Sequence, residues 1–116
     1  MTVDISNLVL LRNDPEEAAR LLEAAEQGDI DAQYAMGLIY AEGRGVEQDA
    51  ALSFLWLTLA SDNGDNDAIT LRNIVAARMS EAEHRQALLL IDQHNSRAAQ
   101  KGLGGRRTRQ QNTRRH

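Results

Sequence analysis

The side chains with the most chemical capability in this 116-residue chain are its histidines, its paired aspartates and a group of C-terminal arginines. His84 and His94 are ten residues apart, which places them on about the same face of a helix but too far apart to share a metal ion. The sequence has no His-Glu-x-x-His motif and no cysteine, which excludes zinc sites of that type, thiolate metal sites and cysteine nucleophiles. We therefore expect neither a metal nor a cofactor.

Two further motifs look chemical but are better explained as structural. Gly43-Arg44-Gly45 is glycine-rich, but it joins two helical patterns and lacks the strand that a phosphate-binding loop follows. Asp29 and Asp31 could form a carboxylate pair, but they stand where helix-capping residues are expected. Since no catalytic constellation is present, we expect a protein that is not an enzyme.

Charge is distributed unevenly along the chain. Residues 1–92 hold all 17 acidic residues and six arginines, a net charge of −11, whereas residues 93–116 carry +7. Five of these charges could contact the phosphates of a nucleic acid: Arg106, Arg107, Arg109, Arg114 and Arg115. No aromatic residue is interleaved for base stacking, so any nucleic-acid binding should be weak and salt-sensitive. The alternatives are a solvated tail or a tail that contacts acidic protein surface.

Helix start and stop signals follow one another along the chain. They predict helices over residues 15–27, 30–42, 49–63, 66–79 and 81–101, with Gly102 ending the last. Ser80 and Glu83 form a capping box before the fifth helix. No alternating β-branched stretch indicates a strand. The prediction is an all-α domain of residues 1–102, followed by a disordered basic tail of residues 103–116.

A repeat is visible within this helical region. The sequence Gly28-Asp29-x-Asp31-Ala32 recurs 36 residues later as Gly64-Asp65-x-Asp67-Ala68. A period of this length is typical of arrays in which short helix pairs stack side by side. Such arrays usually bind other proteins on the surface of the stacked helices.

Residues 24–63 resemble one repeat of the Sel-one-like family, whose members are relatives of the tetratricopeptide repeats. The resemblance rests on Ala32-Gln33, Met36-Gly37, Tyr40, Gly43-Arg44-Gly45-Val46, Gln48-Asp49, Trp56, Ala60 and Gly64. Residues 18–28 resemble the second half of a preceding repeat. Residues 67–102 resemble a degenerate following repeat, in which Met79-Ser80 replaces the glycine loop. The resemblance implies a short α/α solenoid of about two repeats.

The signature residues imply particular packing. Gly37 in mid-helix costs about 1 kcal/mol relative to alanine, which is tolerable if a neighbouring helix backbone packs closely there. Tyr40 lies one turn further on the same face. We expect Trp56 to be buried between the second, third and fourth helices, and Val46 to pack from its loop into the core.

The solenoid geometry of the family implies a concave groove that binds a partner peptide or helix. The residues expected to line it are Asp31, Tyr34, Leu38, Ala41 and Glu42 from one helix and Asp67, Thr70, Ile74 and Arg78 from the next. The alternative is that Leu38 and Ile74 only pack between repeats. The expected function is a protein-binding adaptor module, with a partner and an oligomeric state that the sequence leaves open. The alternative is a nucleic-acid-associated accessory protein that binds through the arginine-rich C-terminal tail.

A second candidate surface lies on the helix of residues 49–63. Leu52, Leu55 and Leu59 follow i, i+3, i+7 spacing and form one apolar stripe. An exposed stripe would be an interface, whereas residues 5–11 or the fifth helix could instead cover it.

The N-terminal residues contain neither the basic region of a signal peptide nor an apolar run long enough for a membrane helix. We therefore expect a cytoplasmic protein that does not bind membranes.

Overall fold

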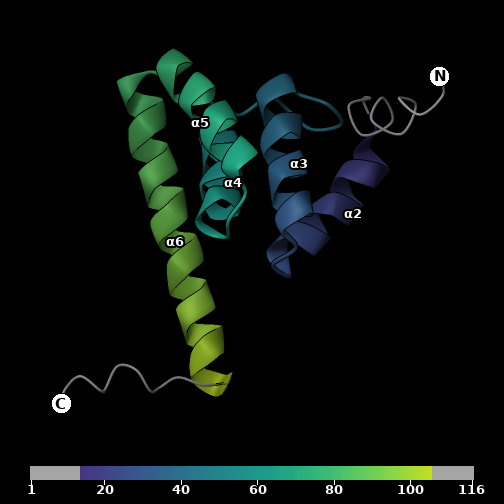
Figure 1. Cartoon of the computed structure of the whole chain (residues 1–116), viewed down its shortest axis with the longest axis vertical. Coiled ribbons are helices and arrows are strands. Elements are labelled where there is room, and N and C mark those ends of the chain that lie inside the picture. The colour runs from purple at the N-terminus through teal and green to yellow at the C-terminus, as the bar shows by residue number, and fades with distance from the viewer. Residues whose placement is uncertain (1–13, 106–116) are drawn as a thin grey trace.

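The computed structural model of the protein describes residues 14–105 and, within them, the side chains of residues 14–100. Five helices follow one another in this range: α2 (Pro15–Glu26), α3 (Ile30–Glu42), α4 (Ala50–Asp62), α5 (Asn66–Arg78) and α6 (Glu81–Gly105) (Figure 1). No strand occurs in this range. The all-α fold is confirmed, and the helix ends before α6 lie within one residue of their predicted positions.

The recurring Gly-Asp-x-Asp-Ala motif is the start of a helix. Asp29 caps α3, and its side chain accepts a hydrogen bond from the backbone N–H of Ala32 at 2.9 Å. Asp65 caps α5 in the same way, accepting from the backbone N–H of Ala68 at 3.2 Å. The repeat therefore recurs because each cap satisfies a backbone donor that the first helical turn leaves unpaired.

The last helix begins as predicted but ends later. Ser80 and Glu83 form a reciprocal capping box, with backbone-to-side-chain hydrogen bonds of 2.9 and 3.0 Å. Helix α6 then continues through Gly102 to Gly105, so the expected end at Gly102 is wrong. A glycine inside a helix costs only about 1 kcal/mol relative to alanine, which does not by itself end the helix. The remaining part of the predicted tail, residues 106–116, lies outside the described residues.

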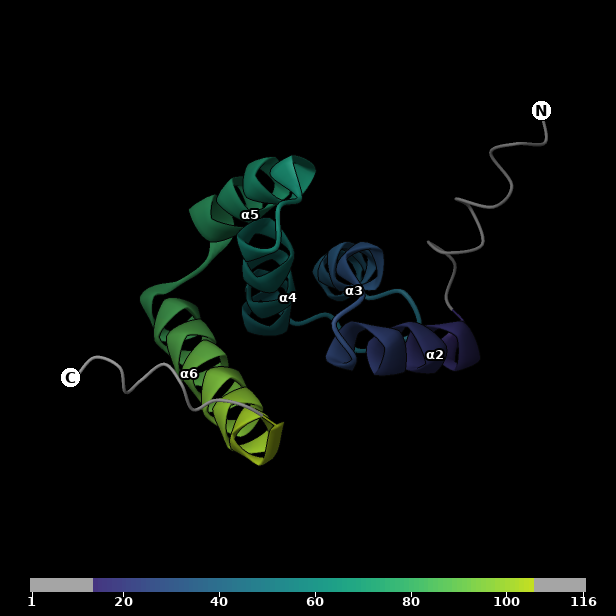
Figure 2. The same ribbon diagram turned by 60° about the horizontal axis from the view of Figure 1, so that its bottom comes forward.

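Helix α4 is the centre of the molecule. It packs against α3, α5 and α6, while α2 packs against α3 (Figure 2). One group of buried residues joins α2, α3 and α4: Ala18, Ala25, Ala32, Met36, Ile39, Leu55, Trp56 and Leu59. A second joins α4 to α5: Leu57, Ala60, Ala68 and Val75. The two groups lie on different sides of α4, which explains why this helix is apolar around most of its circumference.

The contact between α3 and α4 is centred on Gly37. A Cβ atom at this position would collide with the Cγ and Cδ2 atoms of Leu57, which is fully buried. The close approach expected at Gly37 is therefore present, but a side chain of α4 makes it rather than the helix backbone. The hydroxyl of Ser53 donates a 2.6 Å hydrogen bond to the carbonyl oxygen of Gly37.

Ser53→Ala should lower the free energy of unfolding by about 0.5–1.5 kcal/mol, because the carbonyl of Gly37 would lose its side-chain donor. Ser96→Ala is the matched control, since Ser96 is exposed on α6. Urea unfolding followed by circular dichroism would measure both changes. Equal effects for the two variants would show that the Ser53 hydrogen bond does not stabilise the α3–α4 contact.

The glycine loop lies close to the beginning of α2. Gly45 has a φ of +84°, and a Cβ atom there would lie 2.6 Å from the carbonyl oxygen of Asp14. Glycine is therefore required both for the backbone conformation and for the space. Val46 is partly buried against the first group of core residues, as predicted.

Candidate functional site

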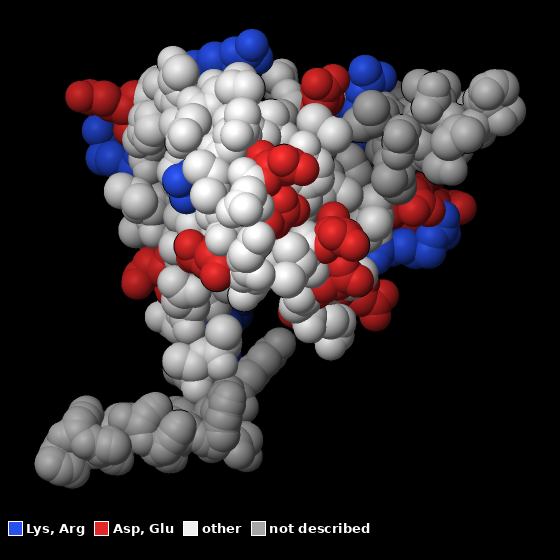
Figure 3. Space-filling view, viewed as in Figure 1, with Lys and Arg blue, Asp and Glu red and all other residues white. Residues whose placement is uncertain are grey.

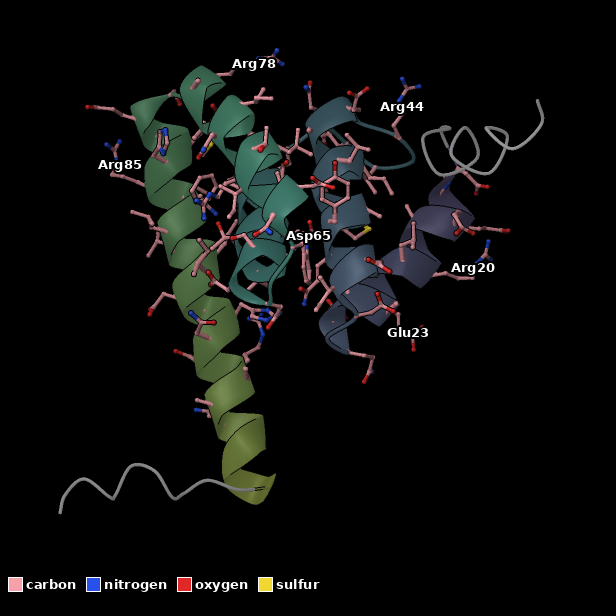
Figure 4. All side chains as sticks on the ribbon, viewed as in Figure 1. Arg20, Glu23, Arg44, Asp65, Arg78 and Arg85 are labelled. Atoms are coloured by element: carbon pink, nitrogen blue, oxygen red, sulfur yellow. The ribbon has the colours of Figure 1, made fainter. Side chains whose placement is uncertain are left out.

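Some of the predicted groove residues line cavities shared by α3 and α5, and we call the surface that holds these cavities the α3–α5 face. The two helices begin at the same end of the molecule and line an open cavity of about 830 Å³. Asp31 and Asp67 line this cavity together with the caps Asp29 and Asp65, and the other lining residues are uncharged. Figure 3 shows acidic side chains gathered where α3 and α5 begin, and Figure 4 labels Asp65 there.

The other end of the α3–α5 face has a mixed character. A cavity of about 440 Å³ brings Ala41 and Arg78 together, with Val75 beneath and Asp49 and Glu83 nearby. The structure therefore places predicted groove residues from both helices at each end of the face. One end is acidic, and the other carries charges of both signs.

In the middle of the α3–α5 face, some predicted groove residues pack against the core and others are exposed. Tyr34 and Ala41 are partly buried against the group of core residues that joins α4 to α5. Ile74 is 45% exposed, and Thr70 is also exposed, whereas Leu38 is half-buried. Glu42 is exposed and forms an ion pair with Arg44 at 3.4 Å. Ile74 is thus available to a partner, while Tyr34 mainly joins neighbouring repeats.

The leucine stripe of α4 is covered. Leu55 is 5% exposed and Leu59 is 8% exposed, and Leu52 is half-buried against the same core. Leu90 and Ile91 of α6 pack against this group. The reading of the stripe as an exposed interface is therefore wrong, because the fifth helix crosses over it. Residues 5–11, the other candidate cover, lie outside the described residues.

A groove nevertheless remains between α2 and α6 above part of this stripe. Its cavity has a volume of about 370 Å³. Its apolar lining consists of Leu22, Leu52, Leu55, Leu90, Ala98 and the aromatic residues Tyr40 and Trp56, and its polar lining of Glu26, His94 and Arg97. We call this cavity the α2–α6 groove. No sequence pattern indicates this groove, because it depends on where α6 crosses α4.

The two internal histidines hold α6 against α4. The ring of His84 meets Phe54 edge-on at 6.1 Å, and the ring of His94 meets Trp56 edge-on at 5.8 Å. A nitrogen of His84 also lies 3.1 Å from the carbonyl oxygen of Ala76. The ten-residue spacing that excluded a shared metal thus matches two aromatic contacts between α6 and α4.

Trp56 is buried, at 4% exposure, as predicted. Its neighbours differ from the prediction, because it packs with α2, α3 and His94 of α6 rather than with the fourth helix, α5. Tyr40 lies beside it on the α2–α6 groove. Burial raises the pKa of Tyr40, and the negative charges of Asp49 and Glu26 raise it further. A tyrosine hydroxyl is already protonated at neutral pH, and this shift favours the same form, so Tyr40 can donate a hydrogen bond.

Gln33 is a structural residue whose role the sequence did not indicate. Its side chain is buried and donates to the carbonyl oxygen of Ala25 at 3.2 Å, while Asn63 donates to its amide oxygen at 3.2 Å. It thereby joins α2, α3 and the end of α4.

The described side chains include no group of three or more His, Asp or Glu residues that could hold a metal ion. No helix within the described residues is long and apolar enough to cross a membrane. The arginines of residues 106–116 lie outside the described range, so their predicted contact with polyanions stays a prediction.

Comparison with known proteins agrees with the geometry. The Sel1 repeat model matches residues 10–29 and 30–65, the second of which includes α3, the glycine loop and α4. The alginate biosynthesis protein AlgK of Azotobacter vinelandii is 30% identical over 90 residues, which cover 77% of this chain and 19% of that protein. No solved structure matches the chain. The chain is a helical protein of the Sel1-like repeat family, with one full repeat over residues 30–65 preceded by part of another.

Proposed function

We propose that this protein is a non-enzymatic adaptor that binds a segment of another protein on the α3–α5 face. Sel1 repeats generally mediate protein–protein interaction, and repeat helices offer a shaped surface rather than reactive groups. The observation that carries the proposal is the pairing of residues from successive repeats at both ends of this face. We infer a partner segment that spans the two repeats.

The chemistry of the face defines the partner segment. Asp31 and Asp67 favour basic side chains at the end where α3 and α5 begin. Ile74, at 45% exposure, offers an apolar contact further along α5. We therefore propose a partner with one or two basic residues followed by an apolar one, in an extended or helical conformation.

Affinity capture with quantitative mass spectrometry tests this proposal. We expect a variant carrying Asp31→Lys, Asp67→Lys and Ile74→Lys to lose the partner that the wild-type chain captures. All three residues are exposed, so the fold should be retained. Ile69→Lys is the matched control, because Ile69 is 38% exposed on α5 but does not belong to the predicted groove. A partner retained by the triple variant would contradict binding on the α3–α5 face.

Truncation after residue 105 separates this function from the nucleic-acid alternative. We expect the truncated chain to keep the protein partner. Any binding to labelled RNA or DNA should fall steeply as salt rises. Tight, sequence-selective nucleic-acid binding at physiological salt, lost on truncation, would favour the alternative.

The name of AlgK reports alginate biosynthesis for that protein alone. The 90-residue similarity supports the same type of repeat surface in both proteins, and it does not identify the partner of the present chain. A cytoplasmic location also stays a prediction, which cell fractionation would test.

A further inference from the structure

We propose that the α2–α6 groove is a binding site for a second copy of this chain, which inserts the outer face of its own α6. This site is built mainly from α2, α4 and α6. It is therefore separate from the α3–α5 face and does not rest on the proposed function.

The groove has the composition of a recognition site. Leucines from three helices and the indole of Trp56 form its floor, and Glu26 and Arg97 supply opposite charges from α2 and α6. Both charged residues are exposed, and neither belongs to an ion pair among residues 14–100. Its volume of about 370 Å³ accommodates side chains rather than a whole helix.

The complementary shape is found on the same chain. Leu88 and Leu89 of α6 are 63% and 56% exposed, more than any other large hydrophobic residue among residues 14–100. Arg85 precedes them by about one turn and Asp92 follows by about one turn, so the four residues share one face of the helix. We call these four residues the α6 ridge. Figure 4 shows Arg85 pointing away from α4, toward solvent.

The charges of ridge and groove match in sign. An inserted ridge would bring Arg85 toward Glu26 and Asp92 toward Arg97, while Leu88 and Leu89 cover the apolar floor. Charge complementarity of this kind sets orientation and suppresses wrong partners. Association would remove the two exposed leucine side chains and the apolar lining of the groove from water, and this burial of apolar surface favours binding.

The geometry also determines the symmetry of the association. The groove side of α6 carries Leu90, His94 and Arg97, whereas the ridge lies on the other side of the same helix. Two copies facing each other cannot fill both grooves at once, so the contact is head-to-tail rather than two-fold symmetric. Each added copy leaves one groove and one ridge free.

Light scattering and sedimentation of the full chain test the proposal. We expect the wild-type mass to rise above that of one chain as the concentration approaches about 1 mM. A ridge variant, Leu88→Glu with Leu89→Glu, and a groove variant, Glu26→Lys with Arg97→Glu, should each raise the dissociation constant at least about tenfold. All four residues are exposed, so folding should be unaffected. Ile69→Glu is the control and should associate as the wild type does.

Mixing the two variants gives the decisive result. The ridge variant keeps its groove and the groove variant keeps its ridge, so an equimolar mixture should form a pair of chains and no larger species. Glutamine in place of glutamate at Leu88 and Leu89 repeats the test without added charge. A wild-type mass of one chain at every concentration would overturn the proposal, and so would wild-type association by both variants.

Discussion

Trp56→Ala should lower the free energy of unfolding by about 3–5 kcal/mol, the largest single effect expected in this protein. The indole is 4% exposed and lies where α2, α3, α4 and α6 meet. Its removal would also open the core to the α2–α6 groove, so that water would reach Leu55. A domain of this size has about 5–15 kcal/mol of stability in total, and the variant should therefore unfold far below the wild-type temperature.

Thermal unfolding followed by far-ultraviolet circular dichroism measures this effect without depending on the lost fluorophore. Ile69→Ala is the matched control, because Ile69 is an apolar residue that is 38% exposed on α5. It should change the midpoint much less. Trp56→Phe should fall between the two, since the phenyl ring fills part of the space. A midpoint for Trp56→Ala equal to that of the control would show that the four helices do not meet on this residue.

The second large effect is expected at Gly37. Replacement by alanine in an open helix would stabilise the protein by about 1 kcal/mol through helix propensity. Here the new Cβ would collide with Leu57, so Gly37→Ala should destabilise instead. Gly37→Leu should destabilise by about 1–3 kcal/mol or more, the range found for overpacked cores. Chemical denaturation of both variants gives the sign and the size.

A double-mutant cycle identifies the cause of the Gly37 effect. Leu57→Ala removes the side chain that a Cβ at Gly37 would strike. The cost of Gly37→Ala should therefore be smaller in the Leu57→Ala background than in the wild type. Equal costs in the two backgrounds would mean that something other than Leu57 requires glycine at this position.

The local structure of this protein could be read from its sequence because the signals act over a few residues. Asp29 and Asp65 are capping residues that predict the starts of α3 and α5, and the capping box of Ser80 and Glu83 predicts the start of α6. Each cap satisfies donors in its own first turn, so no distant part of the chain affects it. The end of α6 was placed wrongly because a single glycine such as Gly102 is a weak local signal for a helix end.

The candidate surfaces could be predicted in part. Asp31 and Asp67, which the repeat offset relates, line one cavity where α3 and α5 begin, because successive repeats stack in register. The exposure of Ile74 and the packing of Tyr34 could not be separated from the sequence, since both lie at helical spacing on the predicted groove.

Only the tertiary structure decided which helix covers which side of α4. Apolar residues surround α4, so its pattern gives no direction for the neighbour that buries Leu55 or Trp56. Besides α2 and α3, that neighbour is α6, whose contacts through His84 and His94 join residues 30 or more positions apart in the chain. Such contacts depend on how five helices share one core, and this same crossing of α6 over α4 creates the α2–α6 groove. The sequence by itself determined the helices, their caps and their repeat, because those follow from local hydrogen bonding, whereas the groove follows from packing that no local pattern encodes.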